Sequence, residues 1–343
     1  MRVTWIIGNG FDLNLGLKTS YRDFIERAYL ASPDGPAKRR LLDSISKVAG
    51  GDVQNWSDLE ELSGIITQEY DVSEKDLFFQ GFEDMLAVLD GYLAKEQEAF
   101  CTRPPSHAMV DEFWGSIARL GERLPPMELA AVGDFQDARE NNSFDFISLN
   151  YTDPFDRLLE AAKREHRPFD RRMNMYRDSA GEVLHVHGTV GPAGGLVFGV
   201  SDDVQVANPA FALDPEFAEL WVKTRRNAYD GFYRTQEAFD RIFKSDLVVV
   251  FGCSLGKTDE YLWHEVVSGL AADEGRRLLV FDHLMPPKAS VRGRLSQIRR
   301  DEVLSRLLSY GAVPDASRAE VCSRICVESA RLVFRFDSRD GAR

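Results

Sequence analysis

The sequence predicts an α/β protein built on a mostly parallel β-sheet with helices on both faces. Short apolar runs rich in β-branched and aromatic residues recur along the 343-residue chain. They alternate with longer segments whose apolar residues recur at helical spacing. The apolar runs are continuous, which is typical of strands buried on both faces, and such strands belong to parallel sheets that helices cover on each side.

The first strand is expected at residues 3–7, and Gly8-Asn9-Gly10 follows it at once, before a helix that begins at Phe11. Glycines after a buried strand allow a tight turn and a close approach of the backbone to a ligand. A strand, a glycine turn and a helix N-terminus form an anion site, so the expected ligand is a nucleotide diphosphate. The turn departs from G-x-G-x-x-G because Leu13 stands at the third glycine position, and a plain tight turn is the alternative.

From residue 37 to about residue 123 the chain has the pattern of helices, inserted after the first strand and helix. We therefore predict that residues 1–32 and 143–343 form a nucleotide-binding α/β domain. Residues 33–142 are expected to form a helical insertion subdomain. Its size and position make it the expected place for a regulatory or oligomer contact.

Further strands are expected at residues 143–149, 183–187, 247–251 and 278–281, with shorter strand-like runs at 196–199 and, as an edge strand, at 332–336. Ligands of such sheets bind beyond the carboxyl ends of the strands. We therefore predict an active site at one edge of the sheet. The turns expected there are Gly8–Asp12, Asn150–Asp153, His187-Gly188 and Gly252–Asp259.

Composition excludes several classes of protein. The formal net charge of −13 argues against broad nucleic-acid binding, which needs a basic face. No apolar stretch is long enough to cross a membrane, and the first apolar run is too short for a secretory signal peptide. The cysteines at positions 101, 253, 322 and 326 include no C-x-x-C pair. We therefore expect no structural zinc and a reducing, cytoplasmic compartment.

Two polar side chains at strand ends are the candidate catalytic residues. Asn150 can hold a water or a ribose hydroxyl, and a turn or helix-cap role before Pro154 is the alternative. His187 has Gly188 beside it, which leaves room for a ligand, and histidine can act as a general base near neutral pH. The alternative is a core histidine. His185 is expected to be structural, and we identify no further ligands for a metal.

The segment Gly252-Cys253-Ser254-Leu255-Gly256 matches G-x-S-x-G between a strand and a helix, the nucleophile-elbow pattern of hydrolases. Asp282 and His283 lie downstream, so a hydrolase that uses Ser254 is one interpretation. A triad needs its acid and base on separate loops, however, and these two residues are adjacent. A second phosphate or ribose turn is the other interpretation. Arg22 lies close to the first glycine turn and is the expected partner of a phosphate or carboxylate.

Five short motifs follow one another along the chain, within residues 6–24 and 146–259. They are G-N-G-F-D, T-x-Y-x-x-F, S-x-N-Y-T, H-x-H-G and F-G-x-S-x-G-x-x-D. In this order they resemble the AbiH family of bacteriophage abortive-infection proteins. That family is in turn similar to the sirtuin-like, or SIR2, NAD-binding fold, which implies a Rossmann-like sheet.

Sirtuin motifs have counterparts here, with two departures. The sirtuin Q-N-I-D corresponds to residues 149–152, so its aspartate falls on Thr152 and Asp153 comes one place late. The catalytic H-G corresponds to His187-Gly188, and G-T-S-L corresponds to residues 252–255. The four-cysteine zinc module of sirtuins is missing, which argues against protein deacetylation.

The resemblance implies cleavage of the bond between nicotinamide and ribose in NAD, as SIR2-type defence proteins do to deplete NAD in an infected cell. The transition state would be oxocarbenium-like. Asn150 would position the ribose hydroxyl or the attacking water, and His187 would be the base. The implied NAD-binding residues are Gly8, Asn9, Gly10, Phe11, Asp12, Tyr21, Arg22, Thr152, Asp153, Gly188, Gly252, Ser254 and Asp259.

Two other functions stay open. One is a sensor that binds NAD or ADP-ribose without hydrolysis and signals to a partner, which Thr152 in place of the sirtuin aspartate favours. The other is the Ser254 hydrolase. The resemblance also implies a homo-oligomer or a partner protein of a defence system, because SIR2-like effectors are often inactive until they assemble.

Overall fold

The computed structural model describes residues 1–49, 58–102, 104–126, 141–165, 170–171, 176–191, 195–229, 233–286 and 293–336. Its centre is a six-stranded sheet in the order β5-β2-β1-β6-β7-β8, and every neighbouring pair is parallel. The strands are β1 (Arg2–Ile7), β2 (Ser143–Ser148), β5 (Ser179–His185), β6 (Leu247–Phe251), β7 (Arg277–Asp282) and β8 (Ile325–Ser329). A separate antiparallel pair joins β3 (Asp170–Arg171) and β4 (Tyr176–Arg177).

Numbered along the chain, the strands of the large sheet lie in the order 3-2-1-4-5-6. This is the order of the doubly wound dinucleotide-binding fold, in which ligands bind where the order reverses. Here the reversal lies between β1 and β6. The predicted Rossmann-like, mostly parallel α/β sheet is therefore confirmed.

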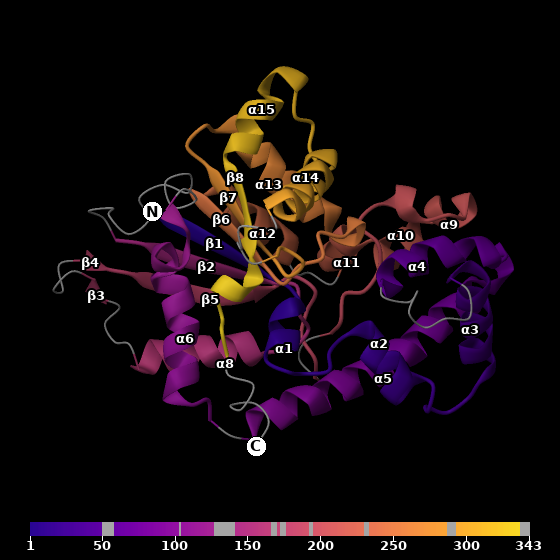
Figure 1. Ribbon diagram of the computed structural model, residues 1–343. Helices are drawn as coiled ribbons and strands as arrows, with labels where there is room; N and C mark the ends of the chain where they lie inside the picture. The colour runs from indigo at the N-terminus through magenta and orange to yellow at the C-terminus, as the bar shows by residue number, and fades with distance from the viewer. Residues whose placement is uncertain are drawn as a thin grey trace.

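Helices surround this sheet (Figure 1). They are α1 (Gly10–Asn14), α2 (Tyr21–Phe24), α3 (Pro36–Ala49), α4 (Leu59–Ile65), α5 (Lys75–Cys101), α6 (His107–Ala118), α8 (Pro154–Glu165), α9 (Pro209–Ala212), α10 (Pro215–Trp221), α11 (Lys223–Tyr229), α12 (Arg234–Phe243), α13 (Glu260–Ala272), α14 (Gly293–Ser309) and α15 (Asp315–Ser323). None of those in the described part of the chain combines the length and apolar character that a membrane span requires.

Each face of the sheet has its own apolar core, because successive strand residues point to opposite sides. Trp5 of β1 belongs to the core shared with α1, α6 and α8, which includes Phe11, Phe113 and Phe155. Ile6, the next residue along β1, belongs to the opposite core, which α12, α13, α14 and α15 cover. Burial on both faces explains why the strands are continuous apolar runs.

A third core lies to one side of the sheet, where Figure 1 shows α3, α4 and α5 together with α9 and α10. Helices α2 to α5 pack there with residues 198–222, and Phe78, Phe82 and Trp221 lie near its centre. Helix α6, by contrast, packs against α8 in the core below the sheet. The division into residues 1–32 with 143–343 and residues 33–142 stays a prediction.

Two predicted strands are wrong. Residues 196–199 have no strand structure, and a single bridge joins the next residue, Val200, to Val222. Residues 332–336 do not pair with the sheet, because β8 occupies the edge beside β7. Phe334 is instead fully buried, with its ring 4.9 Å from that of Phe251. The apolar run predicted as a strand therefore covers one face of the sheet.

Candidate active site

The glycine turn after β1 packs directly on the turn after β6, at the point where the strand order reverses. Gly8 N donates to Phe251 O at 2.9 Å, and Gly10 N donates to Gly252 O at 2.8 Å. A Cβ atom on Gly10 would lie 2.5 Å from the Gly252 Cα atom, and Gly252 has a φ of +72°. Both conditions require glycine. The contact between the two turns is therefore one reason for these glycines, in addition to any approach of a ligand.

Asp12, Asn150 and Thr152 form a buried cluster beside this turn. Asn150 Nδ2 donates to Asp12 Oδ1 at 3.1 Å, and the Thr152 hydroxyl donates to the other carboxylate oxygen of Asp12. Burial raises the pKa of Asp12 to about 6, although both hydrogen bonds oppose the shift. The structure thus brings together three residues that the sequence placed at the site.

The carbonyl oxygen of the Asn150 side chain, Oδ1, is buried and has no hydrogen-bond partner among the described residues. An ionised Asp12 accepts hydrogen bonds only, so it holds the amide with Nδ2 toward itself and Oδ1 away. A buried acceptor without a partner is costly. Asn150 Oδ1 is therefore a ready acceptor for an O–H or N–H group of a ligand.

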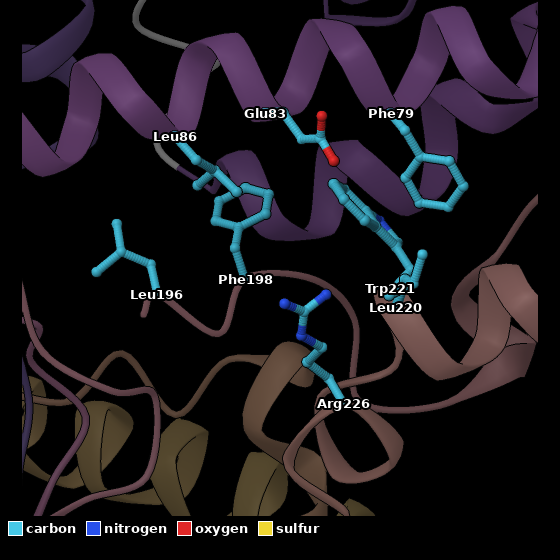
Figure 2. A pocket seen from close by; sticks show the side chains of 8 residues that line it. All are labelled: Phe79, Glu83, Leu86, Leu196, Phe198, Leu220, Trp221 and Arg226. Atoms are coloured by element: carbon cyan, nitrogen blue, oxygen red, sulfur yellow. The ribbon is translucent and has the colours of Figure 1, made fainter. Parts of the chain in front are cut away.

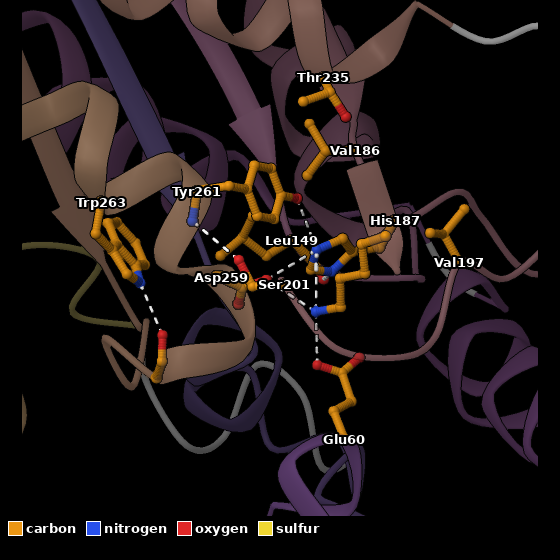
Figure 3. Close-up of polar contacts among 12 residues, drawn as sticks. Glu60, Leu149, Val186, His187, Val197, Ser201, Thr235, Asp259, Tyr261 and Trp263 are labelled. Atoms are coloured by element: carbon orange, nitrogen blue, oxygen red, sulfur yellow. Dashed lines mark hydrogen bonds and ion pairs between the residues drawn. The ribbon is translucent and has the colours of Figure 1, made fainter. Parts of the chain in front are cut away.

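His187 lies in a second cluster, two residues beyond the end of β5, and is 3% exposed. Its Nδ1 donates to Leu149 O at 3.2 Å, because a carbonyl oxygen only accepts, so Nε2 is the nitrogen that faces the rest of the cluster. Asp259 Oδ1 lies 3.0 Å from Nε2, the Tyr261 hydroxyl 3.3 Å and Lys223 Nζ 3.5 Å. Figure 3 shows Asp259 and Tyr261 pointing toward the imidazole ring of His187.

Lys223 is fully buried and links this cluster to the helical insertion. Its Nζ donates to Glu60 Oε2 at 2.7 Å and to Asp259 Oδ1 at 2.9 Å. Burial lowers the pKa of Lys223, but the two carboxylates outweigh that effect and the pKa is raised. For Asp259 the signs are opposite. Burial raises the pKa of this carboxyl, but Lys223 and His187 outweigh burial and the pKa is lowered. Lys223 and Asp259 are therefore both ionised at neutral pH.

Some predicted site residues have their side chains elsewhere. The carboxamide of Asn9 holds the following loop, since its Nδ2 donates to Thr19 O at 3.0 Å and its Oδ1 accepts from Thr19 Oγ1 at 2.6 Å. Phe11 is a core residue with no exposed surface. Arg22 is exposed on α2. The side chains of Asn9 and Phe11 therefore have structural roles, and the Phe11 N–H donates within the turn to Gly8 O at 2.9 Å.

Other predicted residues lie near the clusters without joining them. Tyr21 is hydrogen-bonded to Tyr151, whose hydroxyl donates to Glu60 Oε1 at 3.2 Å. Asp153 pairs with Arg157 of α8 at 2.9 Å. Gly188 follows His187 with a φ of +77°, which favours glycine at that position.

His185 lies between Asn150 and the surface. Its Nδ1 donates to Asn150 O at 2.9 Å, and its Nε2 lies 3.0 Å from Asp156 Oδ2. Burial lowers the pKa of His185, but the Asp156 carboxylate outweighs it and the pKa is raised. These contacts fit the expected structural role, because they hold the backbone that carries Asn150.

The Ser254 turn does not have the surroundings of a hydrolase triad. Asp282 is paired with Arg299, whose Nη2 lies 2.7 Å from Asp282 Oδ2, and His283 is exposed. Ser254 itself is exposed, and the positive φ values of this turn are those of Gly252 and Leu255. A nucleophile elbow would instead place the strain at the serine.

A pocket lies between α5 and residues 196–226, and Figure 2 shows the side chains that line it. Its volume is about 130 Å³. It is lined in the described part of the chain by Phe79, Glu83, Leu86, Leu196, Phe198, Leu220, Trp221 and Arg226. These side chains include no residue that the sequence placed at the site. Within the described residues, no group of three or more His, Cys, Asp or Glu side chains is placed to hold a metal ion.

Sequence reasoning missed Lys223 and Tyr261, which contact His187, and Glu60, which binds Lys223. Helical glutamates and lysines are normally exposed, so their type alone gives no signal. The sequence did hold one signal for Lys223. This residue directly follows the apolar run Leu220-Trp221-Val222, a position that favours burial.

Comparison with known proteins places the chain in a family. The model of the family described as "Bacteriophage abortive infection AbiH" matches residues 4–281. The chain belongs to the AbiH family. It is thus an abortive-infection protein, as the order of its motifs predicted. No curated protein matches this AbiH chain. A solved chain described as a mutant Sir2 homologue in complex with ADP-ribose is similar to it, with 12% identity, a TM-score of 0.29 and coverage of 90% of this chain and 92% of that chain.

Proposed function

We propose that this AbiH chain binds NAD and hydrolyses it to nicotinamide and ADP-ribose. The observation that carries the proposal is that Asn150 Oδ1, just beyond β2, is buried and has no hydrogen-bond partner within the described part of the chain. A ribose hydroxyl or a water supplies the O–H group that this atom lacks. The strand order supports a dinucleotide ligand, because the order reverses between β1 and β6, and Asn150 follows β2, which pairs with β1.

In this reaction the bond between C1′ of ribose and the nicotinamide nitrogen breaks, and a water oxygen forms the new bond to C1′. One proton of that water must leave. Asn150 Oδ1 orients the water or the neighbouring ribose hydroxyl, while Asp12 holds the amide in the required orientation. His187 Nε2 takes up the proton as general base, and the adjacent Asp259 carboxylate stabilises the charged ring.

The test measures NAD consumption by chromatography of nicotinamide and ADP-ribose, with purified protein and with cells under phage challenge. Asn150→Ala and His187→Ala should each lower turnover by about 100-fold or more. His264→Ala is the matched control, because His264 is an exposed histidine of α13 and should keep wild-type turnover. Full turnover by either site variant would show that the assignment is wrong.

A second candidate function is binding of NAD or ADP-ribose without hydrolysis. The observation that favours it is that both ring nitrogens of His187 contact other protein groups. Calorimetry with NAD separates the two functions. Binding that needs Asn150 and yields no nicotinamide, in purified protein or in infected cells, would favour the sensor.

A further inference from the structure

Three charged side chains and an imidazole meet in the interior, and each comes from a different segment. Glu60 lies on α4, Lys223 on α11, Asp259 immediately before α13, and His187 after β5. Their side chains are between 0% and 13% exposed. Burying such a group costs free energy, and hydrophobic residues of similar volume would often be at least as stable. A role other than stability is therefore the better explanation.

The partners around His187 Nε2 suit both protonation states of the ring. A neutral Nε2 accepts a hydrogen bond, and Lys223 Nζ at 3.5 Å and the Tyr261 hydroxyl at 3.3 Å are donors. A protonated Nε2 donates, and Asp259 Oδ1 at 3.0 Å is an acceptor. Nε2 itself therefore has a hydrogen-bond partner in both protonation states.

Lys223 is the member that holds this arrangement together. Its ammonium contacts Asp259 and Glu60 at the same time and offsets their negative charge when His187 is neutral. Glu60 is itself fixed by the Tyr151 hydroxyl, which lies 3.2 Å from its other oxygen. The position of the Asp259 carboxylate at His187 thus depends on a glutamate of the predicted helical insertion.

We propose that Lys223 and Glu60 are positioning residues for His187. They hold Asp259 at Nε2 and present a donor to the neutral ring, so that the ring is ready to take the proton from the attacking water. The inference rests on the proposed NAD hydrolysis and deepens it. The proposal also makes the site dependent on α4. If α4 moved and carried Glu60 away, Lys223 would lose one of its two carboxylate partners and would no longer be held at Asp259.

The experiment compares kcat, KM and the pH–rate profile of wild type with Lys223→Met and with the double variant Glu60→Gln/Lys223→Met. The double variant removes one charge of each sign and so protects the fold. Lys75→Met is the matched control, because Lys75 also binds two carboxylates, each at 2.7 Å, but lies outside this cluster. Thermal unfolding and NAD calorimetry accompany each variant.

The expected result is a fall in kcat of about tenfold or more in both Lys223 variants, with KM changed by less than about threefold. The acid limb of the profile should move to higher pH, because the ammonium 3.5 Å from Nε2 has been removed. The groups that face Nε2 are Asp259, Lys223 and Tyr261, with Glu60 behind Lys223.

A folded double variant with wild-type kcat and an unmoved profile would overturn this inference and leave NAD hydrolysis standing. Equal losses in Lys75→Met and the double variant would also overturn it, because they would reflect stability alone. Absence of NAD turnover in the wild type, in purified form and in infected cells, would instead overturn the proposed function on which the inference rests.

Discussion

Replacing Asp12 with asparagine should stabilise the protein at neutral pH. Burial raises the pKa of Asp12 from 3.8 to about 6, so the folded state resists ionisation of this carboxyl. Asparagine keeps the contacts, since its oxygen accepts from Asn150 Nδ2 and its amide donates to the Thr152 hydroxyl, which can turn round to accept. The variant therefore removes the cost of burying a charge without opening a cavity.

The magnitude follows from linkage. A difference of about 2.2 units, from 3.8 to about 6, at about 1.4 kcal/mol per unit, gives about 3 kcal/mol. Below pH 3.8 the carboxyl is protonated in both states, and Asp12 lowers stability little. As pH rises toward 6 the unfolded chain loses the proton first, so the wild type is progressively destabilised. Above pH 6 the penalty is complete and constant.

Urea denaturation of wild type and Asp12→Asn at several pH values between about 4 and 8 measures this difference. The variant should gain about 3 kcal/mol at about pH 7.5 and little at about pH 4. Asp84→Asn, on the exposed face of α5, is the control for removal of a surface carboxylate. An advantage of equal size at every pH, or a variant less stable than wild type near neutral pH, would refute the reasoning.

Three further experiments test other parts of the structure. Gly252→Ala should lower the free energy of unfolding by roughly 3 kcal/mol or more, because its Cβ would lie 2.8 Å from Phe11 N. Gly16 also has a positive φ but has nothing within 4 Å, so Gly16→Ala should cost only about 1 kcal/mol. Denaturant titration measures both changes. Lys223→Met should cost about 3–5 kcal/mol by leaving buried carboxylates unpaired, and equal stability of variant and wild type would contradict the buried pairs. Wild type should resist a fluorophosphonate probe, because Asp282 is paired with Arg299 and is not free to complete a triad; labelling at Ser254 would support the hydrolase.

The sheet was predictable because most of its strands are continuous apolar runs, which is the pattern of strands buried on both faces. The run Leu247–Phe251 is apolar throughout, and it lies between two other strands with both faces covered. The edge strand β8 was missed because Glu328 and Ser329 interrupt the pattern, while the more apolar run at 332–336 covers a face without pairing.

The site was predictable only where polar residues end strands. Asn150 and Asp12 follow strands that lie next to each other, so their meeting follows from the sheet. The partners of His187 are different, because Glu60 and Lys223 lie on helices whose faces are set by tertiary packing. No local pattern states which charged residues of separate helices will be buried together.

The contact between the two glycine turns has a consequence for synthesis of the chain. Gly10 packs on Gly252, and Arg2 N donates to Asp246 at a separation of 244 residues, so these contacts of the N-terminal segment form only after β6 has been synthesised. Closing so long a loop is slow relative to local folding. A nascent chain that ends before β6 already contains Asn150 and His187. It lacks Gly252, however, so the first glycine turn has no second turn to pack against. Under the proposed function, incomplete translation products would therefore spare the NAD of the cell that makes them.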